Sequence, residues 1–225
     1  MGPTSKSIIR KTLWALSAIF LTLFSMAAIA GSFDPVSAVM SGGFAFGSID
    51  WEGGDNIGGF TSEAFLGFYH EVDSWPSLKS NPANDAELVT LEGNYTMKQD
   101  KNFIRVYVTP RTFGAEAENQ GEIDGKSFLQ KGTFFLPGTR EETIAFGRKI
   151  NNARGVLIGT DPNTGKRIQF GSREFPCHFK PQLNFGNEPT SRRGITVEFE
   201  ADNFLPAMIY PGAIPLSGGE IPAQS

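Results

Sequence analysis

A strict alternation of apolar and polar residues over 194–201 (GITVEFEA) constrains the fold of this chain more than any other feature. Every second residue, Ile195, Val197 and Phe199, is apolar, and the residues between them are polar or charged. A period of two places the apolar set on one side of an extended strand. The segment therefore predicts a strand with one buried and one solvent-facing side.

Two further patterns predict strands. Residues 155–160 and 166–170 flank the turn sequence DPNTG, whose residues preset or tolerate the backbone angles of a tight turn, so we expect a β-hairpin there. Residues 102–109 (NFIRVYVT) alternate as well, with bulky side chains on both sides. Bulk on both faces predicts a strand that is central in a sandwich or packed against a neighbour.

The sequence predicts one α-helix, over about residues 139–152. Thr139 and Glu142 have the spacing of a capping box, in which the Thr hydroxyl accepts from a backbone amide and the Glu carboxylate reaches back. Ile144, Phe146 and Ile150 follow at helical spacing and form an apolar stripe.

Composition places these elements in a mainly β domain. The chain has 20 Phe against 4 Tyr and 3 Trp, together with 26 Gly and 14 Pro. Phe favours strands, whereas Gly and Pro interrupt them at turns. The expected fold is a β-sandwich or barrel of about eight or nine strands with one flanking α-helix.

Residues 1–39 differ from the rest of the chain. Basic residues near the N-terminus precede an uncharged apolar stretch over 12–31, which contains an A-x-A motif at Ala28–Ala30. This layout is typical of a secretory signal peptide. A membrane anchor and a non-native upstream extension, with the natural start at Met40, are the alternatives.

The remaining chain is predicted as one β domain over 40–212, followed by a flexible C-terminal arm over 213–225. It is acidic, because residues 40–225 hold 17 basic and 23 acidic residues. This excess of acidic residues argues against a protein that binds the phosphates of nucleic acid.

The sequence contains no pattern typical of a catalytic, cofactor or metal site, and we expect none. In the segment 121–127 (GEIDGKS) the glycines stand one residue too close for a phosphate-binding P-loop. Cys177 and His178 are adjacent, so on a strand they point to opposite faces and do not form a catalytic pair.

Several segments resemble tail-tube-like virion proteins of tailed phages, particularly phages associated with Bacteroidota. The segments that carry the resemblance are EGNYTMKQDKNFIRVYVTP, ENQGEIDGKSF, TFFLPGTREETIAFGRKINNARGVLI, GKRIQFGSREFPCHF and GITVEFEADNFLP. The resemblance in segment order covers roughly the last four-fifths of the chain.

The resemblance implies a β-sandwich or barrel with one helix that assembles into rings, usually hexameric. Such rings stack into a hollow tube through which DNA passes without specific binding. It further implies a place in the virion tail, assembly in the host cytoplasm, contacts with other tail proteins and no small-molecule substrate. The lumen of such tubes tends to be acidic, which makes Glu198 and Glu200 candidates for a lumen surface.

Self-assembly needs contact surfaces, and sheet edges with unpaired amides are the expected means. Aromatic and Met side chains outside the clearest strands are the interface candidates. They are Phe44, Phe46, Trp51, Trp75, Tyr95 and Met97.

Two other functions stay open on the sequence. If residues 1–30 act as a signal peptide, the chain is an exported β-sandwich binding module of the bacterial envelope, in the periplasm or at the cell surface. A secreted hydrolase is the third option, since paired carboxylates serve glycosidases. Its candidate residues are Glu116, Glu118, Glu122 and Asp124.

Overall fold

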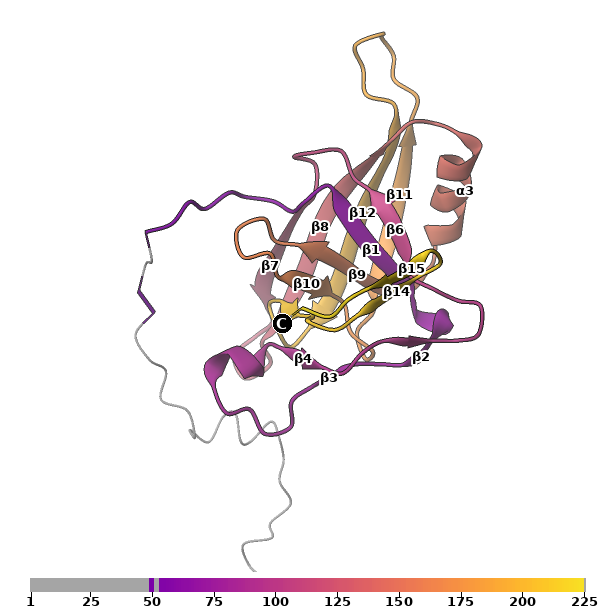
Figure 1. Ribbon diagram of the computed structural model, residues 1–225. Helices are drawn as coiled ribbons and strands as arrows, with labels where there is room; N and C mark the ends of the chain where they lie inside the picture. Colours follow the sequence, from indigo (N-terminus) through magenta and orange to yellow (C-terminus); the bar gives the residue numbers. More distant parts are fainter. Residues whose placement is uncertain (1–48, 51–52, 225) are drawn as a thin grey trace, which may run out of the picture. The chain divides into compact units, whose positions relative to one another are not determined.

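The computed structural model describes residues 49–50 and 53–224 (Figure 1). The predicted leader over 1–39 and the interface candidates Phe44, Phe46 and Trp51 lie outside the described residues. Within the described ranges, no helix combines the length and apolar character needed to cross a membrane.

The mainly β prediction is confirmed. Nine strands form one large antiparallel sheet, in the order β13-β10-β9-β11-β12-β8-β7, with β1 joined to β9 and β6 joined to β1. No closed barrel forms in the part of the chain that the structure describes. The nine strands are β1 (Glu63–Phe68), β6 (Ile104–Tyr107), β7 (Gly114–Gln120), β8 (Ser127–Pro137), β9 (Arg154–Thr160), β10 (Arg167–Phe170), β11 (Cys177–Asn184), β12 (Gly194–Asn203) and β13 (Met208–Ile209).

Small elements accompany the large sheet. Three two-stranded sheets pair β2 (Val72–Ser74) with β5 (Thr96–Met97), β3 (Ser77–Leu78) with β4 (Leu91–Glu92), and β14 (Ile214–Leu216) with β15 (Gly219–Ile221). Two short 3-10 helices, η1 (Tyr69–Glu71) and η2 (Asp85–Leu88), lie in the connections.

Strands β1 and β9 separate two apolar clusters, because each strand is buried on both faces. Leu66 and Leu157 point into the first cluster, and Phe65 and Ile158 point into the second. The first cluster consists of Ala64, Leu66, Phe68, Val106, Val108, Phe113, Phe134, Ile150, Leu157, Phe170, Cys177, Phe179, Ile195, Val197, Phe199 and Ala201. The second cluster consists of Phe65, Val72, Leu91, Tyr95, Phe103, Val156, Ile158, Met208, Tyr210 and Ile214.

The strongest strand predictions are confirmed. In β12, Ile195, Val197 and Phe199 are buried in the first cluster, as the period of two requires. Strands β9 and β10 form the expected antiparallel hairpin. Its turn is closed by the amide of Asp161, which donates to Lys166 O at 2.9 Å, and by that of Gly165, which donates to Asp161 O at 2.9 Å.

The predicted helix forms as α3 (Glu141–Ile150), the one α-helix among the described residues. Its N-cap is Arg140 and carries no side-chain cap hydrogen bond, so the expected Thr139–Glu142 capping box is wrong. The Thr139 hydroxyl instead accepts from Arg193 at 3.3 Å. Helix α3 packs closely on β12: a Cβ added at Gly147 would lie 2.8 Å from Ile195 Cδ1.

The central position predicted for residues 102–109 is wrong. Strand β6 pairs only with β1 in the large sheet, so it lies at an edge. Arg105 and Tyr107 are exposed, and Arg105 forms an ion pair with Glu63 on β1. On this side of the segment Phe103 is buried in the second cluster, whereas Arg105 and Tyr107 face solvent.

The C-terminal residues pack on the domain, which corrects the expectation of a free arm over 213–225 for the residues described, up to 224. Strands β14 and β15 form a hairpin, and Ile214 is fully buried in the second cluster. The buried Arg167 side chain donates to Gly212 O at 2.7 Å and to Pro222 O at 2.9 Å. Two hydrogen bonds from the Arg167 guanidinium thus hold the C-terminal segment, whose Pro and Gly content had predicted a flexible arm.

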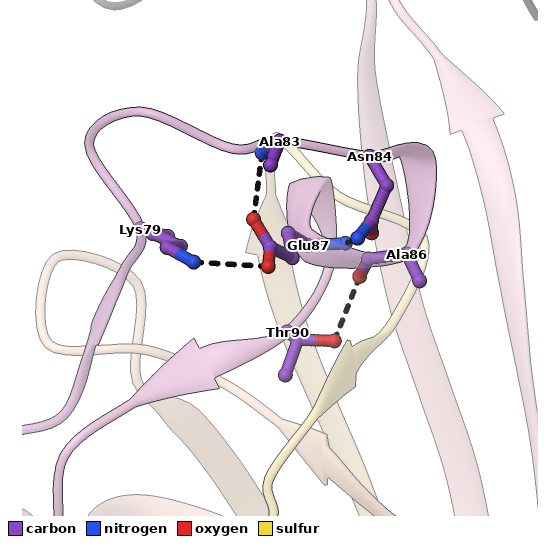
Figure 2. A network of polar contacts seen from close by, with 6 residues as sticks. All are labelled: Lys79, Ala83, Asn84, Ala86, Glu87 and Thr90. Atoms are coloured by element: carbon purple, nitrogen blue, oxygen red, sulfur yellow. Dashed lines mark hydrogen bonds and ion pairs between the residues drawn. The ribbon is translucent and has the colours of Figure 1, made fainter.

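The long connection before β4 is ordered by one carboxylate (Figure 2). Glu87, in η2, accepts from the amide of Ala83 at 2.6 Å and from Lys79 Nζ at 2.9 Å. The Asn84 side chain caps η2 by accepting from the Glu87 amide at 3.1 Å, and Thr90 donates to Ala86 O at 2.7 Å. The polar residues of this segment thus hold one another in place.

Candidate functional site

The lumen candidates Glu198 and Glu200 lie at the centre of a polar sheet surface, which we call the outer face. It is the side of β7, β8, β12 and β11 opposite the first cluster, and the pairing registers place its residues on one side of the sheet. None of its residues is buried. The outer face consists of Glu116, Glu118, Gln120, Ser127, Leu129, Lys131, Thr133, Phe135, His178, Lys180, Gln182, Thr196, Glu198, Glu200 and Asp202.

Charges of opposite sign meet across the strands of the outer face. Lys131 on β8 lies 2.7 Å from Glu118 and 3.4 Å from Glu116, both on β7. The hydrogen bond with Glu118 is the main cause that raises the pKa of Lys131 above its ordinary value. Lys180 on β11 pairs with Glu200 on β12 at 2.7 Å.

The outer face is acidic on balance, but it is not a uniform acidic surface. It carries five carboxylates and two lysines, besides His178. Glu200 is paired, whereas Glu198 lies opposite Thr133 and Lys180 in the register and forms no ion pair within the described residues. Cross-strand pairs of opposite charge stabilise neighbouring strands modestly, so part of this charge pattern serves the sheet itself.

The carboxylates proposed for a hydrolase divide into two groups. Glu116 and Glu118 lie on β7 and share Lys131, whereas Glu122 and Asp124 lie in the exposed turn that follows β7. All four carboxylates lie within nine positions of one another in the sequence. In the structure the first two lie on β7 and the other two lie beyond its end. Among the described residues, no three His, Cys, Asp or Glu side chains come together as a metal site requires.

Three interface candidates can be located, and all three contact the second cluster. Tyr95 is 4% exposed and belongs to that cluster, so it is not available as a surface residue. Trp75 and Met97 are half-buried against the same cluster, and the Trp75 ring meets that of Tyr95 edge-on at 5.7 Å. The side chains of Tyr95, Trp75 and Met97 therefore contribute to packing inside the domain.

A buried chain of hydrogen bonds starts at Tyr95. Its hydroxyl donates to Gln169 Oε1 at 2.9 Å, and the Gln169 amide donates to Gly171 O at 3.0 Å. The Gly171 amide then donates to Gln130 Oε1 at 2.9 Å, and Gln130 Nε2 donates to Leu205 O at 2.9 Å. This chain satisfies the buried side-chain amides of Gln130 and Gln169 and joins strands β8 and β10 to the connections around them.

Cys177 and His178 point to opposite faces of β11, as expected. The Cys177 thiol is fully buried in the first cluster, and His178 is exposed on the outer face. Burial raises the pKa of the Cys177 thiol, which keeps it protonated and a poor nucleophile.

The edge of β7 is a feature that the sequence did not indicate. Strand β7 pairs with β8 over seven consecutive residue pairs without a register shift, and its other edge has no partner in the described residues. Its sequence, GAEAENQ, holds residues of low β propensity. The only sequence signal was a short alternation, in which Ala115 and Ala117 face the interior and the two glutamates face outward.

Compared with known proteins, the chain matches no protein-family model, no curated protein sequence and no solved structure.

Proposed function

We propose that this chain is a non-enzymatic structural subunit of the tail-tube type, which assembles with copies of itself into stacked rings around a hollow lumen. In this proposal the rings belong to a virion tail, and DNA passes through them without specific binding. The resemblance of five sequence segments to tail-tube-like proteins supports it, together with a mainly β domain that carries one helix.

The observation that carries self-assembly is the open edge of β7. An edge strand presents a row of unpaired amides and carbonyls, and natural proteins usually protect such edges with bulges, prolines, charged side chains or very short strands. Strand β7 has regular pairing, contains no proline and is seven residues long, and its two glutamates are paired with Lys131 on β8. A strand from a neighbouring copy would complete its hydrogen bonding.

The outer face suits the second part of the proposal. Its surplus of carboxylates repels the phosphates of DNA, and its two lysines are engaged by glutamates from the neighbouring strands. A polyanion that passes such a surface finds few free cations to which it can bind.

Two separate variants, each with a single proline at one of two consecutive positions of β7, test the assembly. Neighbouring amides of a strand point to opposite edges, so one of Ala117→Pro and Glu118→Pro removes a bond to β8 and the other removes only an amide on the open edge. We expect the second kind of variant to keep the native circular dichroism spectrum and to lose the rings and tubes that the wild type shows by negative-stain microscopy. Undiminished assembly of that variant, or a wild type that stays monomeric across salt and protein concentrations, rejects the proposal.

An exported binding module of the envelope is the second candidate, and the leader-like pattern of residues 1–39 favours it. Mass spectrometry of the protein from its native host separates the two. A mature N-terminus at Gly31 supports export, whereas a start at Met40 supports the virion proposal. An N-terminus at Met1 leaves the leader uncleaved and argues against secretion of a processed protein.

A further inference from the structure

Two unlike features lie at opposite ends of the β7–β8 hairpin. At one end, the turn after β7 carries Ile123, which is 84% exposed, between the exposed carboxylates of Glu122 and Asp124. We call residues 122–124 the acidic tip. The tip is held in a tight turn, because Gly121 has φ +99° and leaves no room for a side chain beside Gly125 O.

At the other end of the hairpin the surface is hollowed. A cavity of about 930 Å³ opens beside the first residues of β7, and we call it the basic hollow. Aromatic rings and prolines line it, among them Phe60, Phe135 and Pro110, and its only charged lining residues are Arg111 and Arg192. Neither arginine forms an ion pair within the described residues.

The two features are complementary in charge and in polarity. The tip offers an apolar side chain between two carboxylates, and the hollow offers apolar walls with two guanidinium groups. Of the carboxylates near the hollow, that of Asp161 accepts from the Thr164 hydroxyl at 2.6 Å and from the Asn163 amide at 3.1 Å, so it is already engaged. Glu198, opposite the lining residue Thr133, forms no ion pair in the described part of the chain. Arginine binds carboxylates strongly because its planar head donates two parallel hydrogen bonds.

Within one copy the tip cannot reach the hollow. Strand β7 spans seven residues between them, and strands rise about 3.4 Å per residue, so the separation is roughly 20 Å. A contact between two different surfaces, each present once on every copy, can repeat from copy to copy without limit.

We propose that the acidic tip of one copy docks into the basic hollow of the next copy, and that this contact stacks one ring on another. The inference rests on the proposed self-assembly and adds the direction of stacking. The open edge of β7 recruits neighbours sideways, across the strand direction. The tip and the hollow lie at opposite ends of the β7–β8 hairpin, so a contact between them joins copies along the strand direction.

A charge exchange in the full-length chain tests the contact. We expect Glu122→Lys with Asp124→Lys to leave single rings and to reduce tubes at least tenfold by negative-stain counting, and Arg111→Glu with Arg192→Glu to do the same. Mixing the two double variants places opposite charges at every contact between unlike copies, so the mixture should again form tubes, in which the two variants alternate. Tubes of wild-type length in either double variant alone, or no tubes in the mixture, overturn the inference while the ring proposal stands.

A disulfide assay decides the contact even if rings do not form. Ile123→Cys chains are mixed with Thr133→Cys chains, since Thr133 lines the hollow and Cys177 is fully buried. We expect a mixed disulfide dimer under mild oxidation that exceeds, at least fivefold, the dimer formed with the exposed control Ser80→Cys. Equal yields overturn the docking, whereas a wild type without any assembly rejects the proposed function itself.

Discussion

The two apolar clusters on either side of β1 and β9 are built by different means. The first is filled mainly by Phe, Val, Ile and Leu, most of them from long strands. The second contains Tyr95 and Tyr210, and buried polar side chains such as Gln169 and Arg167 border it. The difference teaches that strand periodicity defines one half of this domain, whereas directional bonds between distant residues define the other half.

The largest effect is expected in the first cluster, for Phe199→Ala. The Phe199 ring is 2% exposed and packs against Phe170 at 5.2 Å and against Phe113 and Phe134 at 6.4 Å. Its removal leaves a cavity among rigid rings, so we expect the free energy of unfolding to fall by about 3–5 kcal/mol. Urea denaturation measures this.

The matched control is Phe204→Ala, because the Phe204 ring is 71% exposed. We expect that variant to lose less than about 1 kcal/mol. Equal losses at the two positions would show that the first cluster does not dominate the stability of the domain.

The first cluster was the predictable half of the fold. Strand β12 and the β9–β10 hairpin follow from alternation and turn residues, which are local properties of the sequence. Helix α3 was likewise found from its apolar stripe, although Arg140 takes the cap position because Thr139 is engaged by Arg193 from the end of the β11–β12 loop. The existence of these elements could be predicted from the sequence, whereas their exact ends depend on contacts with residues that are distant in the sequence.

The second largest effect is expected for Arg167→Met. This variant tests the C-terminal hairpin separately from the strands of the first cluster. The variant keeps the bulk but removes the donors to Gly212 O and Pro222 O. We expect a loss of about 1–3 kcal/mol, because at least one buried carbonyl is left without a partner.

Hydrogen exchange locates the loss from Arg167→Met. Amides of the β14–β15 hairpin should exchange faster, while those of β12 should stay protected. Lys166→Met, at the neighbouring exposed position, is the control and should change neither. Faster exchange in β12 would mean that Arg167 supports the whole sheet.

The packing of the C-terminal hairpin could not be predicted, because its partners are far away in the sequence. Arg167 binds residues 45 and 55 positions later, and the amide of Phe103 donates to Pro215 O at 2.9 Å. A segment rich in Pro and Gly has no periodicity that reveals such contacts. The same holds for the candidate site: the glutamates of the outer face were visible in the sequence, whereas their pairing with Lys131 and Lys180 required the strand register.

A smaller effect, visible at high pH, is expected for Tyr95→Phe. Burial raises the pKa of Tyr95 well above its ordinary value, so the folded protein keeps the phenol neutral. The stabilisation is fully present below the unfolded pKa of about 10 and is lost as pH rises toward the folded pKa. We expect the unfolding free energy to fall above pH of about 10, and to fall less steeply in Tyr95→Phe.

The control for that slope is Tyr107→Phe, whose ring is 59% exposed. It should follow the wild-type pH dependence. At neutral pH, Tyr95→Phe should lose about 1 kcal/mol, because Gln169 Oε1 then lacks its buried donor. An unchanged alkaline slope in Tyr95→Phe would assign the dependence to another buried group, such as Tyr210.

The smallest effect is expected for Glu87→Gln, in the exposed connection of Figure 2. The hydrogen bond from the Ala83 amide and the ion pair with Lys79 lower the pKa of Glu87 below its ordinary value. Because the folded pKa is the lower one, the stabilisation is present above the unfolded pKa of about 4.3 and is lost as pH falls through the folded pKa. We therefore expect faster amide exchange over residues 83–90 in Glu87→Gln near neutral pH, with the difference from wild type vanishing in acid. Glu92→Gln, at the exposed position of β4, is the control. A difference that persists below the folded pKa would show that the shape of the side chain, and not its charge, orders this connection.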